Sequence, residues 1–263
     1  MLSHKNIYIA TLNTVISLGA NKDSTAHPAV LPIFHITAEL FALVSLHLGA
    51  KTVLLNGFNP VTVLALIESE KLEFAILLPL MWKAMLGCAE LNNYDYSSMQ
   101  LGMYGMAPMD SPTLEKLSEV FDCPFITGSG QTEINGIATV MDSHWVGVKE
   151  GNIWGDGSIA SDQAVMDDQG NLLAPGEIGE VVWRSPQVML AYYRNDEATH
   201  EAPHRPDARH RHEQPTSPGP SGPSSYRDMA LVRLGRAGGA TAGVDGVCET
   251  DAYLMVRIAE DQV

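Results

Sequence analysis

The stretch Gly128-Ser129-Gly130-Gln131-Thr132-Glu133 follows an apolar run, Cys123 to Ile126, that is typical of a buried strand leaving the edge of a sheet. Two glycines allow the backbone to turn sharply and to approach a ligand closely. The Thr132 hydroxyl can donate to a phosphate oxygen, and the Glu133 carboxylate can hold a hard cation such as Mg²⁺. A plain turn followed by a helix start explains the same stretch, so its interpretation depends on the sequence around it.

Short apolar runs alternate with helical stretches before this point. The expected strands are Ala29–Ile33, which places Phe34 and His35 at a strand end, Lys51–Leu55, Glu73–Leu78, Leu101–Tyr104 and Cys123–Ile126. The expected helices are Ser3–Leu18, His35–Leu48, Asn59–Glu70, Pro79–Leu91 and Asp110–Phe121. This alternation predicts parallel β-α-β crossovers and a central sheet with helices on both faces. We therefore expect an α/β core, a parallel sheet flanked by helices, over residues 1–140.

Three turns, around His35, Gly105 and Gly130, fall at the ends of expected strands. Ligands of parallel α/β sheets bind at the carboxyl ends of the strands. We therefore expect the three turns to meet at one edge of the sheet and to face one nucleotide-sized site. Each turn also has a structural interpretation: His35 as a satisfied histidine at a helix start, and residues 105–108 as an ordinary strand-to-helix turn.

The pattern changes beyond Val140. Gln163–Met166, a polar turn at residues 167–171 and Ile178–Arg184 predict an antiparallel hairpin, so we expect a small β-rich subdomain over residues 141–199. The segment Pro203–Pro223 holds six prolines and many His, Arg, Ser and Gly residues. Such a composition cannot bury enough apolar surface to offset chain entropy, so we expect residues 200–263 to be a disordered, aberrant tail. A reading-frame disturbance near His200 would explain the sudden enrichment in arginine and proline.

Composition excludes several classes of function. The formal net charge of −15 argues against nucleic acid as a partner, because phosphate binding requires clustered cations. No apolar run approaches the ~20 residues of a transmembrane helix. The first 20 residues resemble a signal peptide only faintly, because Asn13, Thr14 and Ser17 interrupt the apolar part. Three widely spaced cysteines favour a reducing cytoplasm over a disulfide or zinc framework.

Four stretches, in this order along the chain, resemble the motifs of the adenylate-forming superfamily, which comprises acyl- and aryl-CoA synthetases, luciferases and peptide-synthetase adenylation domains. They are Pro32-Ile33-Phe34-His35 (P-x-F-H), Gly105-Met106-Ala107-Pro108 (G-x-A-P), Gly130-Gln131-Thr132-Glu133 (G-x-T-E), and the block that runs from Pro175-Gly176-Glu177-Ile178-Gly179-Glu180 through Val188, Met189 and Tyr192 to Asn195 and Glu197-Ala198-Thr199. The resemblance implies that the chain is part of the large N-terminal domain of such an enzyme.

The resemblance further implies an acid–CoA ligase that uses ATP, Mg²⁺ and coenzyme A and acts on a small carboxylic acid, of the fatty-acyl or a related class. The carboxylate attacks the α-phosphorus of ATP, giving an acyl-adenylate (acyl-AMP) and pyrophosphate, and a thiol then displaces AMP. The implied catalytic residues are His35, Thr132 and Glu133, with Glu133 as the metal ligand. The implied nucleotide-binding residues are Gly105, Met106, Ala107, Pro108, Ser129, Gly130, Gln131 and Thr132. Met189, Tyr192 and Tyr193 are expected to pack rather than to contact ligand.

The sequence departs from the family pattern in four places. Ser129 stands where the family has an aromatic residue that lies against adenine. The family's phosphate loop, closed by Pro-Lys-Gly, normally precedes a segment like Met1–Asn6 and is not found in these 263 residues. The T-G-D segment expected after Thr199 and the small C-terminal domain with its lysine are not found either. We therefore expect a fragment with little or no adenylation activity; the alternatives are a non-catalytic nucleotide- or acyl-binding module and a non-functional gene product.

Overall fold

In the computed structural model, three parallel strands from the predicted β-α-β units form one side of the central sheet. The structure describes residues 1–21, 23–24, 26–141, 155–167, 169–174, 177–202 and 231–233. Within them one sheet contains, in this order, β3 (Phe74–Leu77), β4 (Leu101–Tyr104), β5 (Phe125–Gln131), β6 (Gly136–Met141) and β7 (Asp156–Gly157). The predicted parallel pairing is confirmed for β3, β4 and β5, whereas β6 and β7 are each antiparallel to the strand before them.

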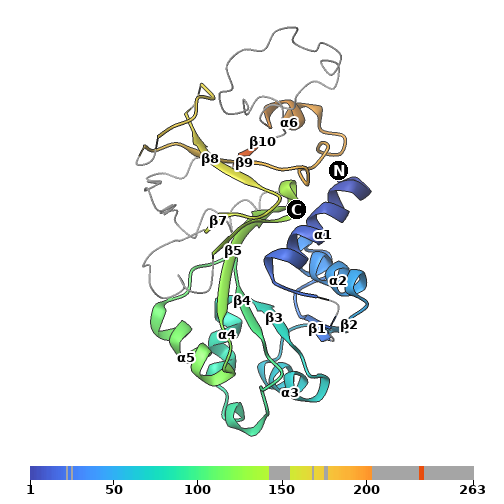
Figure 1. Cartoon of the computed structure of the whole chain (residues 1–263), viewed down its shortest axis with the longest axis vertical. Helices are drawn as coiled ribbons and strands as arrows, with labels where there is room; N and C mark the ends of the chain where they lie inside the picture. The colour runs from blue at the N-terminus through green and yellow to red at the C-terminus, as the bar shows by residue number, and fades with distance from the viewer. Residues whose placement is uncertain are drawn as a thin grey trace.

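A second, two-stranded parallel sheet lies beside β3 and consists of β1 (Ala26–Ala29) and β2 (Lys51–Leu54) (Figure 1). The sequence had placed the first strand at Ala29–Ile33, and that position is wrong by several residues. The strand ends at Ala29, and residues 30–34 form the connection to the next helix. Pro32 lies in this connection, although β1 itself contains a proline, Pro28.

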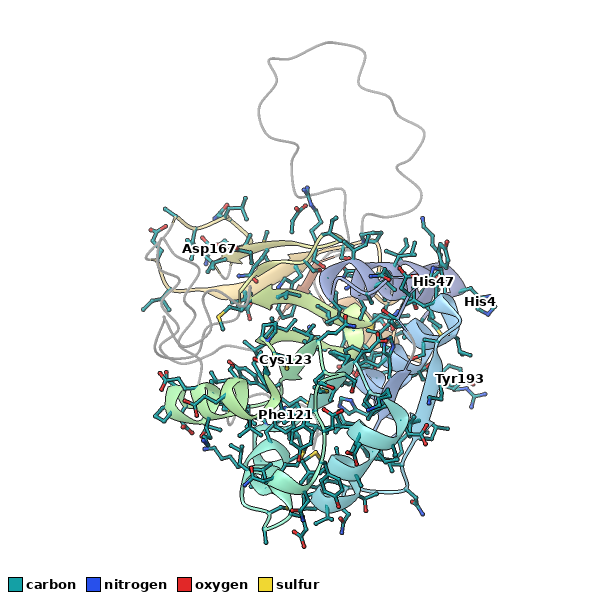
Figure 2. The ribbon with its side chains drawn as sticks, turned by 60° about the horizontal axis from the view of Figure 1, so that its bottom comes forward. His4, His47, Phe121, Cys123, Asp167 and Tyr193 are labelled. Atoms are coloured by element: carbon teal, nitrogen blue, oxygen red, sulfur yellow. The ribbon has the colours of Figure 1, made fainter. Side chains whose placement is uncertain are left out.

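Helices cover both faces of the sheet, as predicted. α3 (Pro60–Glu70), α4 (Pro79–Leu86) and α5 (Ser111–Phe121) pack on one face, and α1 (His4–Ser17) and α2 (Ile36–Leu48) lie on the other. Alternate residues of β3 point to opposite sides: Leu77 joins the core around Trp82, whereas Ile76 joins the core around Phe41. Phe121 lies among the side chains between α5 and the sheet (Figure 2). The sheet is therefore the middle layer of an α/β fold.

Local sequence signals account for most helix ends. Ser3 forms a capping box with Asn6 at the start of α1, and Asn59 and Asp110 cap α3 and α5. α4 ends at Leu86 rather than near Leu91, because Gly87 follows it and disfavours continuation; a separate 3₁₀ turn covers Leu91–Asn93. Within the described ranges, no helix combines the length and the apolar character that a bilayer span requires.

The β-rich part contains the predicted hairpin. β8 (Asp162–Met166) and β9 (Glu180–Arg184) pair in antiparallel fashion, with Asp162 opposite Arg184. The Arg184 guanidinium donates to the Asp162 carboxylate from Nε at 2.9 Å, which pins this end of the pair. A short helix, α6 (Asp196–Glu201), begins at the capping residue Asn195 and was not predicted.

Several sequence predictions concern residues outside the described ranges. They are the predictions for Pro203–Pro223, for residues 234–263, and for Pro175-Gly176 of the fourth motif block. Part of the predicted tail is described: Leu231–Arg233 forms β10, which pairs with β9 and was expected to be disordered. The proposed domain limits at residues 140 and 199 stay predictions.

Candidate functional site

The Gly128–Glu133 stretch is not a sharp turn, because β5 runs through it to Gln131. The strand pairs with β6 and carries a bulge between Ser129 and Gly130. The glycines allow the backbones of β5 and β6 to lie close together rather than allowing the chain to turn. A Cβ at Gly130 would collide with the Gly136 carbonyl group across the hairpin. The turn itself comes later, as a 3₁₀ segment over Thr132–Ile134 that ends at Asn135 with φ of 55°.

The turn Gly105–Pro108 follows β4 directly and lies beside this hairpin. In the parallel register Tyr104 is opposite Thr127, and a Cβ at Gly105 would lie 3.7 Å from the Gly128 carbonyl oxygen. Met106 has φ of 65°, a left-handed conformation that side chains rarely adopt. Strained residues of this kind concentrate at ligand sites. The structure thus places the Gly105–Pro108 turn beside β5 at Gly128, on the strand that leads to the Thr132–Ile134 turn.

His35, the third predicted position, is the N-cap of α2. Its Nδ1 accepts a hydrogen bond from the Thr37 backbone N–H at 3.2 Å, and the side chain is half-buried. α2 packs against the start of β6, where Leu40 fills the space beside Gly136. Among the described residues no hydrogen bond joins His35 to either of the other turns. The role of His35 as the N-cap of α2 therefore explains the one hydrogen bond that its Nδ1 makes with the described residues.

The polar side chains of the hairpin differ in whether they have partners. Ser129, which is buried, pairs its hydroxyl with that of Thr139 at 2.7 Å, so its side chain is engaged within the protein. Thr132 is exposed. The amide nitrogens of Gln131 and Asn135 are buried and have no partner among the described residues. A buried donor without a hydrogen-bond partner lowers the stability of a fold and is therefore rare, yet the end of this hairpin has two of them in the described part of the chain.

Glu133 is held by a residue that was assigned to packing. The Tyr192 hydroxyl donates to Glu133 Oε1 at 2.8 Å, and the Met189 backbone N–H donates to the Glu133 carbonyl oxygen at 2.7 Å. Burial raises the pKa of Tyr192, and the hydrogen bond to the Glu133 carboxylate and its charge raise it further. The fourth motif block contains Tyr192, but nothing in its spacing indicated which side chain it reaches.

Two asparagines of α1 donate hydrogen bonds to residues 185–192, the segment that carries Met189 and Tyr192. We call this segment the bridging segment. Asn6 Nδ2 donates to the carbonyl oxygens of Pro186 and Val188 at 3.0 and 2.9 Å. Asn13, which is 2% exposed, donates to the side chain of Gln187 at 3.2 Å. The sequence pattern shows Asn13 only as an interruption of an apolar run, and the partners of both asparagines lie far away in the sequence.

The chemistry of Glu133 suits a magnesium ion supported by a nucleotide. No group of three or more His, Cys, Asp or Glu side chains with metal-binding geometry occurs in the described part of the chain. Mg²⁺ in nucleotide sites is commonly held by one or two carboxylates together with phosphate oxygens and waters. Glu133 is half-buried, and Oε2 accepts no hydrogen bond from the described residues. A single carboxylate with one free oxygen therefore fits this cation.

The chain is similar to known proteins over most of its length. A family model described as AMP-binding enzyme matches residues 1–193. The chain is 30% identical over 204 residues to the probable 4-coumarate–CoA ligase 1 of Dictyostelium discoideum, covering 76% of this chain and 37% of that protein. It is 29% identical over 211 residues to the long-chain-fatty-acid–CoA ligase of Salmonella typhimurium, covering 76% of this chain and 36% of that protein.

The fold is similar to that of a solved structure, O-succinylbenzoate coenzyme A synthetase from Bacillus subtilis in complex with ATP and magnesium ion. The TM-score is 0.69 at 22% identity, covering 76% of this chain and 41% of that one. The chain thus spans less than half the length of the relatives it matches. The resemblance drawn from four motifs and the predicted fold class are both confirmed. The chain belongs to the family of AMP-binding enzymes.

Proposed function

We propose that this chain supplies the adenine-nucleotide site of an acid–CoA ligase. The observation that carries the proposal is the position of the Gly105–Pro108 turn after β4: Gly105 lies beside Gly128 of β5, the strand that leads to Thr132 and Glu133. The parallel ladder of β4 and β5 ends there, and α/β sheets bind ligands at the carboxyl ends of their strands. The family and the CoA-ligase relatives support the same assignment.

In this proposal the two turns have different tasks. Residues 105–108 form the wall beside adenine and the acyl group, and the left-handed Met106 holds that wall in shape. The exposed Thr132 hydroxyl donates to a phosphate oxygen. Gly130 and Gln131 contribute as the end of the strand that positions Thr132, because Gly130 allows β5 to lie close to Gly136. Ser129 contributes through its backbone, because its hydroxyl is paired with Thr139. His35 borders the carboxylate of the acid.

Glu133 is the residue that would hold Mg²⁺. Bound there, the cation supplies charge stabilisation to phosphate oxygens. The protein's own contribution is to position ATP and the carboxylic acid so that the acid oxygen attacks the α-phosphorus and pyrophosphate leaves. Positioning and electrostatic stabilisation dominate phosphoryl chemistry of this type. Coenzyme A is the proposed acceptor of the acyl group, and the proposed acid is a fatty-acyl or related carboxylate, as the names of the relatives suggest.

The 263-residue chain alone is expected to bind nucleotide with little turnover, because its residues include no Ser/Thr/Gly-rich loop closed by Pro-Lys-Gly. Calorimetry with AMP tests the binding, and ATP–pyrophosphate exchange with a panel of aliphatic and aryl acids tests the turnover. Thr132→Val should weaken AMP binding about tenfold or more, as the loss of a hydrogen bond to a charged group does. Thr52→Val, on β2 and away from the site, is the matched control.

The outcomes separate the alternatives. Binding of AMP that Thr132→Val weakens and Thr52→Val leaves unchanged supports the proposal. Binding with no exchange for any acid is expected of the chain alone and of a nucleotide-binding module alike, whereas exchange with one of the acids would exclude the module. No detectable binding of AMP, ATP or an acyl-adenylate analogue by a well-folded chain would refute the proposal.

A further inference from the structure

The bridging segment holds Glu133 at two points. Tyr192 donates its hydroxyl to Oε1 at 2.8 Å, and the Met189 N–H donates to the Glu133 carbonyl oxygen at 2.7 Å. One contact fixes the side chain and the other fixes the backbone that carries it. A carboxylate held in this way has a defined orientation, and its second oxygen, Oε2, accepts no hydrogen bond from the described residues.

The bridging segment is itself anchored before Tyr192 and at Tyr192. Before Tyr192, Asn6 and Asn13 of α1 bind Pro186, Val188 and Gln187, and the Leu190 N–H donates to the Met1 carbonyl oxygen at 2.8 Å. At Tyr192 the backbone N–H donates to the Thr199 hydroxyl of α6 at 3.0 Å. The tyrosine hydroxyl therefore approaches Glu133 from a backbone that two helices immobilise.

We propose that Tyr192 is a positioning residue for the cation: its hydroxyl holds Glu133 so that Oε2 faces the metal that accompanies the bound nucleotide. The inference rests on the proposed nucleotide site. Groups that hydrogen-bond metal ligands orient them, and removing such a group commonly lowers metal affinity about 10–100-fold. Tyr192 touches neither the nucleotide nor the cation and acts through Glu133.

The test uses the linkage between nucleotide and cation in the full 263-residue chain. Calorimetry measures the affinity for a non-hydrolysable ATP analogue, α,β-methylene-ATP, once in saturating Mg²⁺ and once in EDTA. The ratio of the two affinities is the gain that the cation provides. Tyr192→Phe should reduce this gain about tenfold while leaving the affinity in EDTA unchanged.

Tyr193→Phe is the matched control, because Tyr193 carries the same hydroxyl one residue later, is 69% exposed and has no hydrogen bond in the described part of the chain. Figure 2 shows Tyr193 at the surface. Glu133→Gln should lose the gain, and adding Tyr192→Phe to it should cause no further loss, since the tyrosine acts through the carboxylate. Thermal melting of each variant confirms that it folds.

Each outcome is decisive. A Tyr192→Phe chain that keeps the full Mg²⁺ gain overturns the inference and leaves the nucleotide site standing. An equal loss in Mg²⁺ and in EDTA, or a further loss on the Glu133→Gln background, also overturns it, because the effect then does not pass through Glu133. If the unmodified chain fails to bind the analogue at all, the proposed function itself fails, and this inference fails with it.

Discussion

Replacing Asn13 by alanine should destabilise the protein far more than replacing an exposed asparagine. The Asn13 amide group donates to the Ile137 carbonyl oxygen and the Ser158 hydroxyl, both at 3.0 Å, and to Gln187 Oε1 at 3.2 Å. Its own oxygen accepts from the Ala160 N–H at 3.3 Å. Asn13 is therefore the hub that joins α1, β6 and the bridging segment.

The loss of unfolding free energy depends on which hydrogen-bond partners of Asn13 have no other partner. The Ile137 carbonyl oxygen keeps its bond from Gln187 Nε2 at 2.7 Å, but Gln187 Oε1 is left buried without its donor. A stranded buried acceptor costs about 1–3 kcal/mol, and each of the other lost bonds about 0.5–1.5 kcal/mol. We expect Asn13→Ala to lower the free energy of unfolding by at least about 2.5 kcal/mol, or at least roughly 5 °C in Tm.

Urea denaturation followed by far-UV circular dichroism measures this loss as a shift of the midpoint at constant slope. Asn92→Ala is the matched control, because Asn92 is exposed and its side chain makes no hydrogen bond in the described ranges; it should change stability by less than about 0.5 kcal/mol. A loss for Asn13→Ala no larger than that of the control would refute the assignment of Asn13 as a structural hub.

Three further predictions concern backbone strain, close packing and pH. Met106→Gly should stabilise the fold by about 1 kcal/mol, because it relieves a left-handed conformation; a lower denaturation midpoint would contradict this. Gly130→Ala should destabilise by about 1–3 kcal/mol, because the new Cβ meets the Gly136 carbonyl group, whereas Gly87→Ala finds ordinary contacts at 3.6 Å and should be nearly neutral in the same assay. Burial lowers the pKa of His27, so the stability it contributes is complete above the ordinary value near 6.5 and declines as pH falls below it. Unfolding midpoints measured between about pH 5 and 8 should show this decline, and His27→Gln should flatten it; an unchanged profile would argue against a neutral, buried His27.

The features that the sequence predicted are those set by near neighbours in the chain. The predicted helix starts at Ser3, Asn59 and Asp110 are set by caps that close within three residues. The alternation of short apolar runs with helices fixed the parallel β-α-β arrangement, because a parallel strand requires a crossover. The turn at residues 105–108 followed from the end of β4.

The features that escaped prediction depend on partners remote in the sequence. Glycines at 128 and 130 are equally compatible with a turn and with a strand that another backbone approaches closely, and only the pairing with β6 decides between them. The hydrogen bond between Tyr192 and Glu133 spans 59 positions and has no local signature. The same holds for Asn13, whose polar side chain breaks an apolar pattern for the sake of a distant partner.

The bond between Asn13 and Gln187 joins residues 174 positions apart, which has a consequence for biosynthesis. At translation rates of about 5–20 residues per second, Gln187 is made roughly 9–35 s after Asn13. During that interval α1 exists without the groups that satisfy its asparagine amides. Closure of so long a loop is slow compared with local helix formation. In a nascent chain interrupted before residue 185, α1 would therefore lack its hydrogen bonds to the bridging segment and would be accessible to chaperones or proteases.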